Sequence, residues 1–318
     1  MKRLAFTILL SALAAAAAAE DRLTIATWNM EWLMTPATFD ALAPACAGMG
    51  LRVGGSERAI PCNLVPASRW SEEDLSRLRG FAATLELDVI ALQETDGAEV
   101  ASLVFPDRTF CFTSRRHVQN VGFAIRRGIP YRCNADYRAL GLPDNTVRWG
   151  ADLTLYPGTP REMRLLAVHL KAACSRGPLT YAQPDCGILQ QQVPILEDWI
   201  DLRAKNDDAF AVIGDFNRRF DRERDAARDA HGRIAAMWPE IDDGEPAGAD
   251  LTDAGADHGA IGCGLGKSMP IDHLVLGRKL ARRMIPGSYR AWEYPDGGRW
   301  PDHCVLSVDI DLGGLNGL

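Results

Sequence analysis

The sequence lacks three features that would each indicate a simple class of protein. It has no excess of positive charge, its formal net charge being −7, so it lacks the overall basic surface of a non-specific nucleic-acid binder. None of its eight cysteines forms the Cys-x-x-Cys pair that is typical of a zinc site. Beyond its first 19 residues it has no apolar run of the roughly 20 residues that a membrane-spanning helix needs.

The acidic balance argues against a nucleic-acid substrate without excluding one. An enzyme can bring a divalent cation to a phosphate group and keep its arginines local. The candidates for a local basic patch are the adjacent pairs Arg115 and Arg116, Arg126 and Arg127, and Arg218 and Arg219. Adjacent arginines are more commonly solvated surface, so these pairs alone do not predict a binding site.

The N-terminus has the pattern of a secretory signal peptide. Lys2 and Arg3 precede the apolar run 4–10, which continues into alanines ending at Ala19. We expect cleavage after Ala19, so residues 1–19 would be the signal and residues 20–318 a single domain, with no transmembrane segment left. The mature protein is then expected to be secreted or periplasmic.

The cysteines all follow the expected signal, and an even number of cysteines in an exported chain indicates disulfide bonds. They fall into neighbouring pairs along the chain. This grouping predicts the bridges Cys46 with Cys62, Cys111 with Cys133, Cys174 with Cys186, and Cys263 with Cys304. The last bridge would anchor the segment after His303 to the loop before Asp272.

Hydrophobic periodicity predicts strands and helices in mixed order. The expected strands are 23–28, 88–93, 109–113, 120–127, 148–156, 161–170, 209–213, 270–277 and 304–312, and the expected helices are 71–86, 97–105, 188–203 and 222–238. Residues 242–266 are expected to form a long surface loop. Since there is no steady strand-helix alternation and no internal repeat, the pattern favours an α+β fold with two packed sheets covered by helices.

Polar side chains follow the apolar strands at their ends. These strand-end residues are Asn29, Glu31, Glu94, His169, Asp215, Asn217, Asp272, His273, Asp302 and His303. Any one of them has an ordinary structural explanation, since a carboxylate after a strand is usually a turn or cap residue and a lone histidine usually makes a structural hydrogen bond. Their combination is more informative than any single member.

In order along the chain, these motifs resemble those of the endonuclease/exonuclease/phosphatase superfamily. The matching segments are Thr27-Trp28-Asn29-Met30-Glu31, Leu92-Gln93-Glu94, Val168-His169-Leu170, Gly214-Asp215-Phe216-Asn217, Ile271-Asp272-His273 and Pro301-Asp302-His303. Pro301 departs from the serine that is common at this position in the family. The resemblance covers nearly all of residues 20–318 and implies a four-layer αββα sandwich of two mostly antiparallel sheets flanked by helices.

The resemblance also implies a metal site. Glu94 would be the main ligand, and Glu31 a second ligand or one acting through water. Such hard oxygen ligands suit Mg²⁺, Mn²⁺ or Ca²⁺, and Mg²⁺ in particular is commonly held by one or two carboxylates together with waters and substrate.

Catalytic roles follow from the same resemblance. His303 would be the general base or a phosphate contact, with Asp302 holding its tautomer. His169 would face the phosphate from the opposite side, as a hydrogen-bond donor or as the acid for the leaving oxygen. Asp215 would orient the attacking water, Asn29 and Asn217 would donate hydrogen bonds to phosphate oxygens, and Asp272 would orient one of the histidines.

His273 and the tryptophans are assigned apart from the resemblance. His273 would point to the opposite face from Asp272 and is expected to be structural. Trp28, Trp32, Trp149 and Trp199 are expected in the core, whereas Trp292, Tyr294 and Trp300 are weaker candidates for substrate contact.

The sequence leaves three functions open. The leading one is an exported metal-dependent phosphodiesterase, a nuclease acting on nucleic acid, because the signal peptide and the cysteines indicate export and His169 resembles the branch that includes secreted deoxyribonucleases. Sphingomyelinases and inositol-phosphate phosphatases share that histidine. The alternative is a lipid or small-molecule phosphoesterase, either sphingomyelinase-like or of the inositol-phosphate type. The third is a non-catalytic binding subunit, against which the intact cluster argues.

Overall fold

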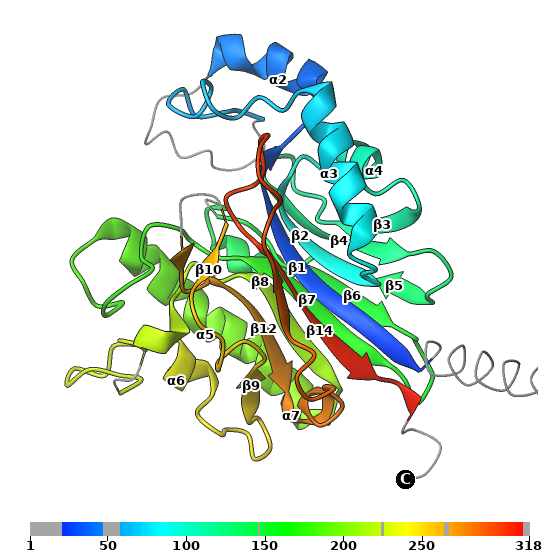
Figure 1. Ribbon diagram of the computed structural model, residues 1–318. Coiled ribbons are helices and arrows are strands. Elements are labelled where there is room, and N and C mark those ends of the chain that lie inside the picture. The colour runs from blue at the N-terminus through cyan, green and yellow to red at the C-terminus, as the bar shows by residue number, and fades with distance from the viewer. Residues whose placement is uncertain (1–20, 47–57, 146, 224–225, 264–266, 314–318) are drawn as a thin grey trace, which may run out of the picture.

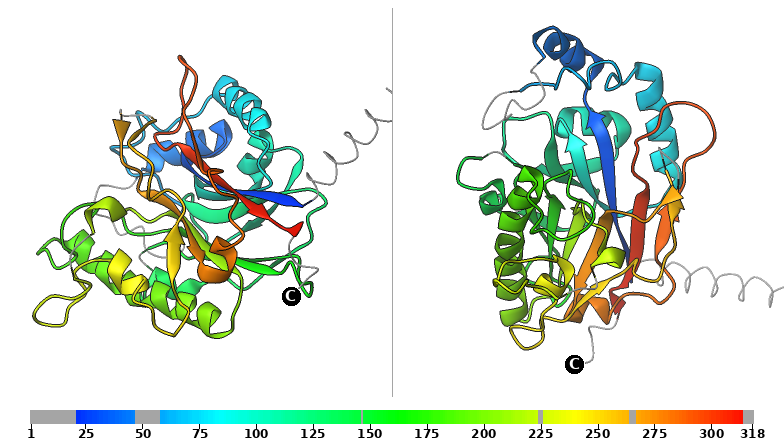
Figure 2. Two further views of the ribbon diagram at one scale, coloured as in Figure 1. Left: turned by 60° about the horizontal axis from the view of Figure 1, so that its bottom comes forward. Right: turned by 90° about the vertical axis from the view of Figure 1, so that its left-hand side faces the viewer.

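A computed structural model describes residues 21–46, 58–145, 147–223, 226–263 and 267–313. They form two six-stranded sheets packed face to face, with helices on both outer faces (Figures 1 and 2). This arrangement confirms the expected α+β sandwich. The expected signal peptide, residues 1–19, lies outside the described residues. Within those residues, no helix has the length and apolar character needed to cross a membrane.

The first sheet is built around a parallel pair, β1 and β2, and its other neighbours are antiparallel. Helices α3 and α4 cover its outer face, while α2 lies beyond the end of β1 (Figure 1). In spatial order the strands are β13 (Arg290–Trp292), β14 (Val305–Asp311), β1 (Arg22–Leu33), β2 (Val89–Thr95), β4 (Asn120–Arg126) and β3 (Arg108–Phe112). The helices are α2 (Pro36–Leu42), α3 (Glu72–Thr84) and α4 (Ala98–Val104).

The second sheet is likewise built around a parallel pair, β7 and β8. Its strands in spatial order are β5 (Tyr131–Cys133), β6 (Ala151–Leu155), β7 (Met163–His169), β8 (Phe210–Asp215), β12 (Asp272–Gly277) and β9 (Leu251–Asp253). The long helix α5 (Pro184–Lys205) and the short α6 (Trp238–Ile241) cover its outer face, as the right-hand view of Figure 2 shows for α5. The remaining elements are α7 (Arg278–Ala281), the small hairpin β10 (Ile261–Gly262) with β11 (Lys267–Ser268), and 3-10 turns at Ala43–Ala45, Arg138–Gly141 and Phe220–Arg222.

Alternation of side chains along the strands explains how the layers pack. On β1, Leu23 and Ile25 belong to the core between the sheets, whereas Ala26 and Trp28 face the core under α3 and α4. On β7, Leu165 and Ala167 likewise face the other sheet, whereas Leu166 and Val168 face α5. Since successive strand residues point to opposite faces, side chains that continue the inner row emerge between the sheets at the strand ends.

Local sequence signals explain the positions of the two longest helices. Helix α3 begins after Ser71, whose side chain and that of Asp74 form the expected capping box. Helix α5 begins at Pro184, where proline needs no backbone donor, and it continues through Pro194. The start of α5 therefore lies before the expected residue 188.

The helix expected over residues 222–238 was wrong. The described part of this segment is irregular and contains an isolated antiparallel bridge between Arg228 and Ile234. The Asp229 side chain accepts backbone hydrogen bonds from His231 and Arg233, both at 2.9 Å, and Gly232 has a φ of 75°. This turn satisfies the local backbone donors in a way that competes with helix formation.

All four expected disulfide bonds are present. The bridge between Cys111 on β3 and Cys133 on β5 connects the two sheets at their edges. The bridge between Cys263 and Cys304 holds the start of β14 to the loop before β12.

Removing the bridge between Cys263 and Cys304 is expected to loosen the segment that precedes β14. The double alanine variant should lose about 3 to 4 kcal/mol of unfolding free energy, because the bridge closes a long loop of 41 residues. Denaturant unfolding measures this loss, and hydrogen exchange of residues 302–304 should rise at the same time. The matched Cys111 and Cys133 double variant should lose similar stability without faster exchange at 302–304, and equal exchange in both variants would contradict the expectation.

Candidate active site

Strand register brings the polar strand ends of the second sheet into one row. His169, the last residue of β7, pairs with Asp215, the last residue of β8. Asp215 also pairs with Asp272, the first residue of the antiparallel strand β12. All three side chains continue the inner rows of their strands and therefore point between the sheets.

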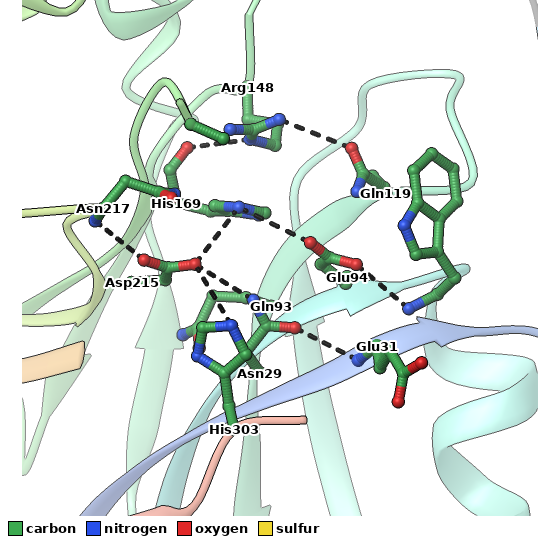
Figure 3. Close-up of polar contacts among 12 residues, drawn as sticks. Asn29, Glu31, Gln93, Glu94, Gln119, Arg148, His169, Asp215, Asn217 and His303 are labelled. Atoms are coloured by element: carbon green, nitrogen blue, oxygen red, sulfur yellow. Dashed lines mark hydrogen bonds and ion pairs between the residues drawn. The ribbon is translucent and has the colours of Figure 1, made fainter. Parts of the chain in front are cut away.

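The first sheet contributes from the opposite side of the same gap. Asn29 on β1 donates from its side-chain nitrogen to Asp215 Oδ2 at 3.1 Å, which directly joins the two sheets. The other Asp215 oxygen accepts from the backbone N–H of Asn217 at 2.7 Å, and Asn217 Nδ2 donates to the Leu170 carbonyl at 3.1 Å. Figure 3 shows Asn29, His169 and His303 converging on Asp215.

His303 is held by a carboxylate, but not by the one that its sequence neighbour suggested. Its Nδ1 lies 2.5 Å from Asp272 Oδ2, whereas Asp302 Oδ1 is 3.9 Å from its Nε2. Asp272 therefore makes the contact that was expected of Asp302, because it lies on the inner row of β12 while the Asp302 side chain is 44% exposed. The Nε2 atom of His303 faces Asp215 Oδ2 at 4.0 Å.

Glu94 and Glu31 lie at the other end of this group. Glu94 Oε1 is 3.7 Å from His169 Nε2, and its Oε2 accepts from the backbone N–H of Trp32 at 3.1 Å. The Asn29 side-chain oxygen accepts from the Glu31 backbone N–H at 3.1 Å, and Glu31 Oε1 lies 3.6 Å from the guanidinium of Arg299. The structure thus brings the strand-end residues of the predicted site together at one end of the sandwich, with His273 alone among them facing the outer side of its sheet.

The backbone departs from regular strand geometry at the places where these side chains are presented. Glu31, Trp32, Glu94 and Asn217 have positive φ angles of 48°, 55°, 54° and 54°, which non-glycine residues rarely adopt. The registers of β1 with β2 and of β2 with β4 also shift beside Glu31 and Glu94. Such irregularities are frequent beside active sites, where they redirect side chains.

The two histidines of the group differ in charge. Burial lowers the pKa of His169 well below its usual value, and the positive charges of Arg148 and His303 add to this effect. Burial alone would also lower the pKa of His303, but Asp272, Asp215 and Asp302 together raise it well above its usual value. At neutral pH His169 is therefore neutral, and His303 is a cation.

The carboxylates have raised pKa values. Burial and the nearby Asp272 raise the pKa of Asp215 to about 7, although the His303 cation opposes this effect. Burial raises the pKa of Glu31 to about 7, with the Asp302 and Glu94 carboxylates adding to the shift and Arg299 opposing it. Burial also raises the pKa of Glu94. Crowded acidic groups of this kind are commonly found at functional sites.

The donor set fits a divalent cation. The Asp302 carboxylate adds to the raised pKa of both Glu31 and Glu94, and Glu94 adds to that of Glu31, so a cation bound beside these carboxylates would relieve the repulsion. Asp215, Asp272 and His303 form a second group, whose ligand atoms lie within 4.8 Å of one another. Buried polar atoms without a hydrogen-bond partner among the described residues also lie in this region: Gln93 Nε2, His169 Nδ1 and Asp272 Oδ1.

Sequence reasoning missed Arg148 and Gln119. Arg148 Nε donates to the His169 carbonyl at 2.9 Å and its Nη2 donates to the Leu170 carbonyl, while its Nη1 lies 3.4 Å from Gln119 Oε1 (Figure 3). Arg148 precedes a strand instead of following one, so the strand-end pattern gave no signal for it.

The arginine pairs do not form a common exposed patch. Arg218 is buried and paired with Glu223, Arg219 pairs with Asp221, and Arg126 pairs with Asp88 at 2.7 Å. Arg115 is buried, and burial lowers its pKa to about 10, with Arg148 as a neighbouring charge. Arg126, Arg218 and Arg219 are therefore paired with carboxylates of the chain itself, whereas Arg116 and Arg127 are exposed.

His273 lies on the opposite face from Asp272, as expected. Its ring bonds to Asp253 Oδ2 at 3.1 Å and to the Arg218 carbonyl at 2.9 Å, and it stacks on Phe220 at 3.8 Å. Trp28 and Trp199 are core residues, whereas Trp32 and Trp149 are only partly buried.

Trp292, Tyr294 and Trp300 pack against the core under α3. The structure gives these three aromatic side chains a packing role in that layer. Any substrate contact by them was only a weaker expectation, and it stays a prediction.

Comparison with known proteins gives a fold match only through solved structures. No protein-family model and no curated protein sequence matches the chain. A humanized D. rerio TDP2 has a TM-score of 0.55 at 17% identity, covering 92% of this chain and 99% of that one. The 3' phosphatase NExo from Neisseria, bound to product DNA hairpin, has a TM-score of 0.55 at 15% identity, covering 91% and 99%.

An AP endonuclease from Archaeoglobus fulgidus is also similar, with a TM-score of 0.52 at 11% identity, covering 91% of this chain and 99% of that chain. At these identities the likeness concerns the fold, and it extends over almost the whole length of each structure. Together with the order of the sequence motifs, it establishes that this chain has the fold of the endonuclease/exonuclease/phosphatase superfamily.

Proposed function

We propose that this protein is an exported, divalent-metal-dependent phosphodiesterase that hydrolyses phosphodiester bonds of nucleic acid. The observation that carries the proposal is the placement of His303. Its ring is fixed by Asp272 at 2.5 Å, and it faces Asp215 across 4.0 Å, beside two amide side chains and a second histidine. Hydrolysis of a phosphoester needs donors for a charged phosphoryl group, a positioned water and a metal, and this arrangement can supply each of them.

The roles of the side chains follow from their charges and contacts. The His303 cation suits contact with a phosphate oxygen and proton donation to the leaving oxygen, because Asp272 orients its ring and maintains its charge. Asp215 suits orientation and deprotonation of the attacking water, since its pKa of about 7 allows it to accept a proton near neutral pH. Asn29 and Asn217 lie on either side of Asp215 and are suited to donate to phosphate oxygens.

His169 has a different role from His303 because it is neutral. Its Nε2 lies 3.4 Å from Asp215 Oδ2 and 3.7 Å from Glu94 Oε1, so it can donate a hydrogen bond there or to substrate without adding a charge. Arg148 fixes the backbone that carries His169 through the His169 and Leu170 carbonyls.

Glu94, Glu31 and Asp302 would hold the cation, which is most simply Mg²⁺, with Mn²⁺ or Ca²⁺ as alternatives. When bound, such a cation supplies charge neutralisation for the phosphoryl oxygens. Trp32 donates its backbone N–H to Glu94, and Arg299 lies beside Glu31, so the protein itself restricts the orientation of both glutamates.

Nucleic acid is favoured as the substrate by the structures of similar fold. One of them, the Neisseria 3' phosphatase NExo, is bound to product DNA, and another is an AP endonuclease. The four disulfide bonds fit folding in an oxidising compartment, so we propose a secreted or periplasmic location for the domain 20–318.

The alternative is a lipid or small-molecule phosphoesterase with the same catalytic group. Membrane contact would favour exposed aromatic side chains near the site. Instead, Trp28 donates a hydrogen bond to the partly buried Tyr294, and Trp300 stacks on that tyrosine at 5.1 Å. These aromatics are used in packing, which favours a soluble phosphodiester substrate over sphingomyelin.

Replacing His303 is expected to abolish most of the activity. His303→Ala should lower kcat on plasmid DNA or RNA by about a hundredfold to ten-thousandfold, the usual contribution of a general acid or base. The measurement uses purified mature protein with Mg²⁺, Mn²⁺ or Ca²⁺. His231→Ala is the matched control, because His231 is exposed in a loop, and it should retain full activity.

The same assay separates the competing functions. Release of phosphocholine from sphingomyelin, or of phosphate from inositol phosphates, without cleavage of nucleic acid would move the protein to the alternative class. If wild type and His303→Ala turn over every substrate equally, or not at all, the proposed catalytic group is wrong.

Glu94→Gln is expected to weaken metal binding without unfolding the protein. The amide can still accept the hydrogen bond from the Trp32 N–H but lacks the negative charge, so Mn²⁺ affinity should fall at least about tenfold. Calorimetric titration of the substrate-free protein measures this affinity. Glu99→Gln, in the first turn of α4, is the control, and unchanged Mn²⁺ affinity in Glu94→Gln would rule out Glu94 as the main ligand.

A further inference from the structure

Tyr294 connects the segment carrying His303 to the core of the first sheet. Its hydroxyl oxygen accepts a hydrogen bond from Trp28 Nε1 at 2.8 Å. The same hydroxyl donates to the His303 carbonyl oxygen at 2.5 Å. An indole N–H can only donate and a carbonyl can only accept, so the direction of both bonds is determined.

The anchor at the far end of this connection is rigid. Trp28 is fully buried on β1, and its ring lies edge-on to Phe81 and Phe105, each at 5.9 Å. A buried aromatic side chain packed on several sides has little freedom to move. Trp28 therefore offers Tyr294 a fixed reference point in the sheet that also carries Asn29.

The Tyr294 ring is also fixed in place, by packing against other aromatic rings. It lies parallel to the Trp300 ring, with centroids 5.1 Å apart and an interplanar angle of 2°, and 5.2 Å from Phe81. Burial raises the pKa of Tyr294 well above its usual value, so the hydroxyl keeps its proton and remains a donor. The segment 294–303 is thus attached to the core at Tyr294 and at Trp300.

The carbonyl that receives this bond belongs to the residue whose ring contacts Asp272. His303 lies outside the regular strand, because β14 begins at Val305, so no strand pairing holds its peptide in place. The disulfide at Cys304 holds the chain on one side, and the Tyr294 hydroxyl bonds to the His303 peptide itself.

We propose that Tyr294 is a positioning residue for His303, whose carbonyl it holds so that the imidazole stays in contact with Asp272 and facing Asp215. The inference rests on the catalytic role proposed for His303, but its structural part can be tested without any activity. Tyr294 itself does not contact the reacting group; its effect passes entirely through the His303 peptide.

The test is Tyr294→Phe, which keeps the ring and its stacking and removes only the hydroxyl. In metal-free wild-type protein, the short bond from His303 Nδ1 to Asp272 should give a low-field proton resonance, which is assigned by its loss in His303→Ala. In Tyr294→Phe this resonance should move upfield or broaden. In the activity assay, kcat should fall by about tenfold to a hundredfold with KM nearly unchanged, because the geometry of a reacting group is lost and not a substrate contact.

Two further variants show whether the effect passes through His303. Tyr137→Phe removes a hydroxyl that also donates to a backbone carbonyl, that of Ile195 at 2.6 Å on helix α5, and it should change neither the resonance nor kcat. In a His303→Ala background, adding Tyr294→Phe should cause no further loss of kcat, since residues that act as a unit are not additive.

An unchanged resonance in Tyr294→Phe overturns the proposal, whether kcat is unchanged or lower. A further loss of kcat in the double variant also overturns it, because Tyr294 would then act independently of His303. If the wild-type protein proves to have no phosphodiesterase activity, the proposed function fails, and the resonance alone still decides whether Tyr294 positions His303.

Discussion

The hydrogen bond between Asn29 and Asp215 is the contact on which the candidate site depends, because it joins side chains from two different sheets. Each sheet has a central parallel pair whose carboxyl ends point to the same end of the sandwich. The antiparallel neighbours β12 and β14 begin at that end, so their first residues or the residues just before them join the group. Strand direction alone therefore gathers residues that are far apart in the sequence. Close packing of the two sheets then brings the site residues of one sheet within hydrogen-bonding distance of those of the other.

Much of this arrangement was predictable because it depends on strand periodicity. Apolar runs that end in a polar residue located most of the strands and the polar strand ends, and alternation correctly placed His273 on the opposite face from Asp272. The disulfide pairs were predictable from proximity along the chain. The αββα architecture and the candidate roles came from the family resemblance, and the roles remain proposals.

The failures have a common cause, which is that tertiary contacts outweighed local sequence. Residues 222–238 have helical composition, yet the Asp229 turn and the bridge from Arg228 to Ile234 replace the helix. Asp302 adjoins His303 in sequence, but Asp272 reaches its ring because the two strands meet in space. Arg148 and Tyr294 support the site through backbone carbonyls, and no residue pattern along the chain reveals such contacts.

Both ends of the described chain lie at the end of the sandwich away from the candidate site, which suits them for attachment of a linker. Arg22 on β1 pairs with Asp311 on β14, and the Leu312 N–H donates to the Asp21 carbonyl at 2.6 Å, so both ends lie side by side at the end of the sandwich opposite Asn29 and His303. A linker joined before Asp21 or after Gly313 would start from that remote end. Protein immobilised on a bead through either linker would therefore present the candidate site outward, toward polymers too large to diffuse beneath it.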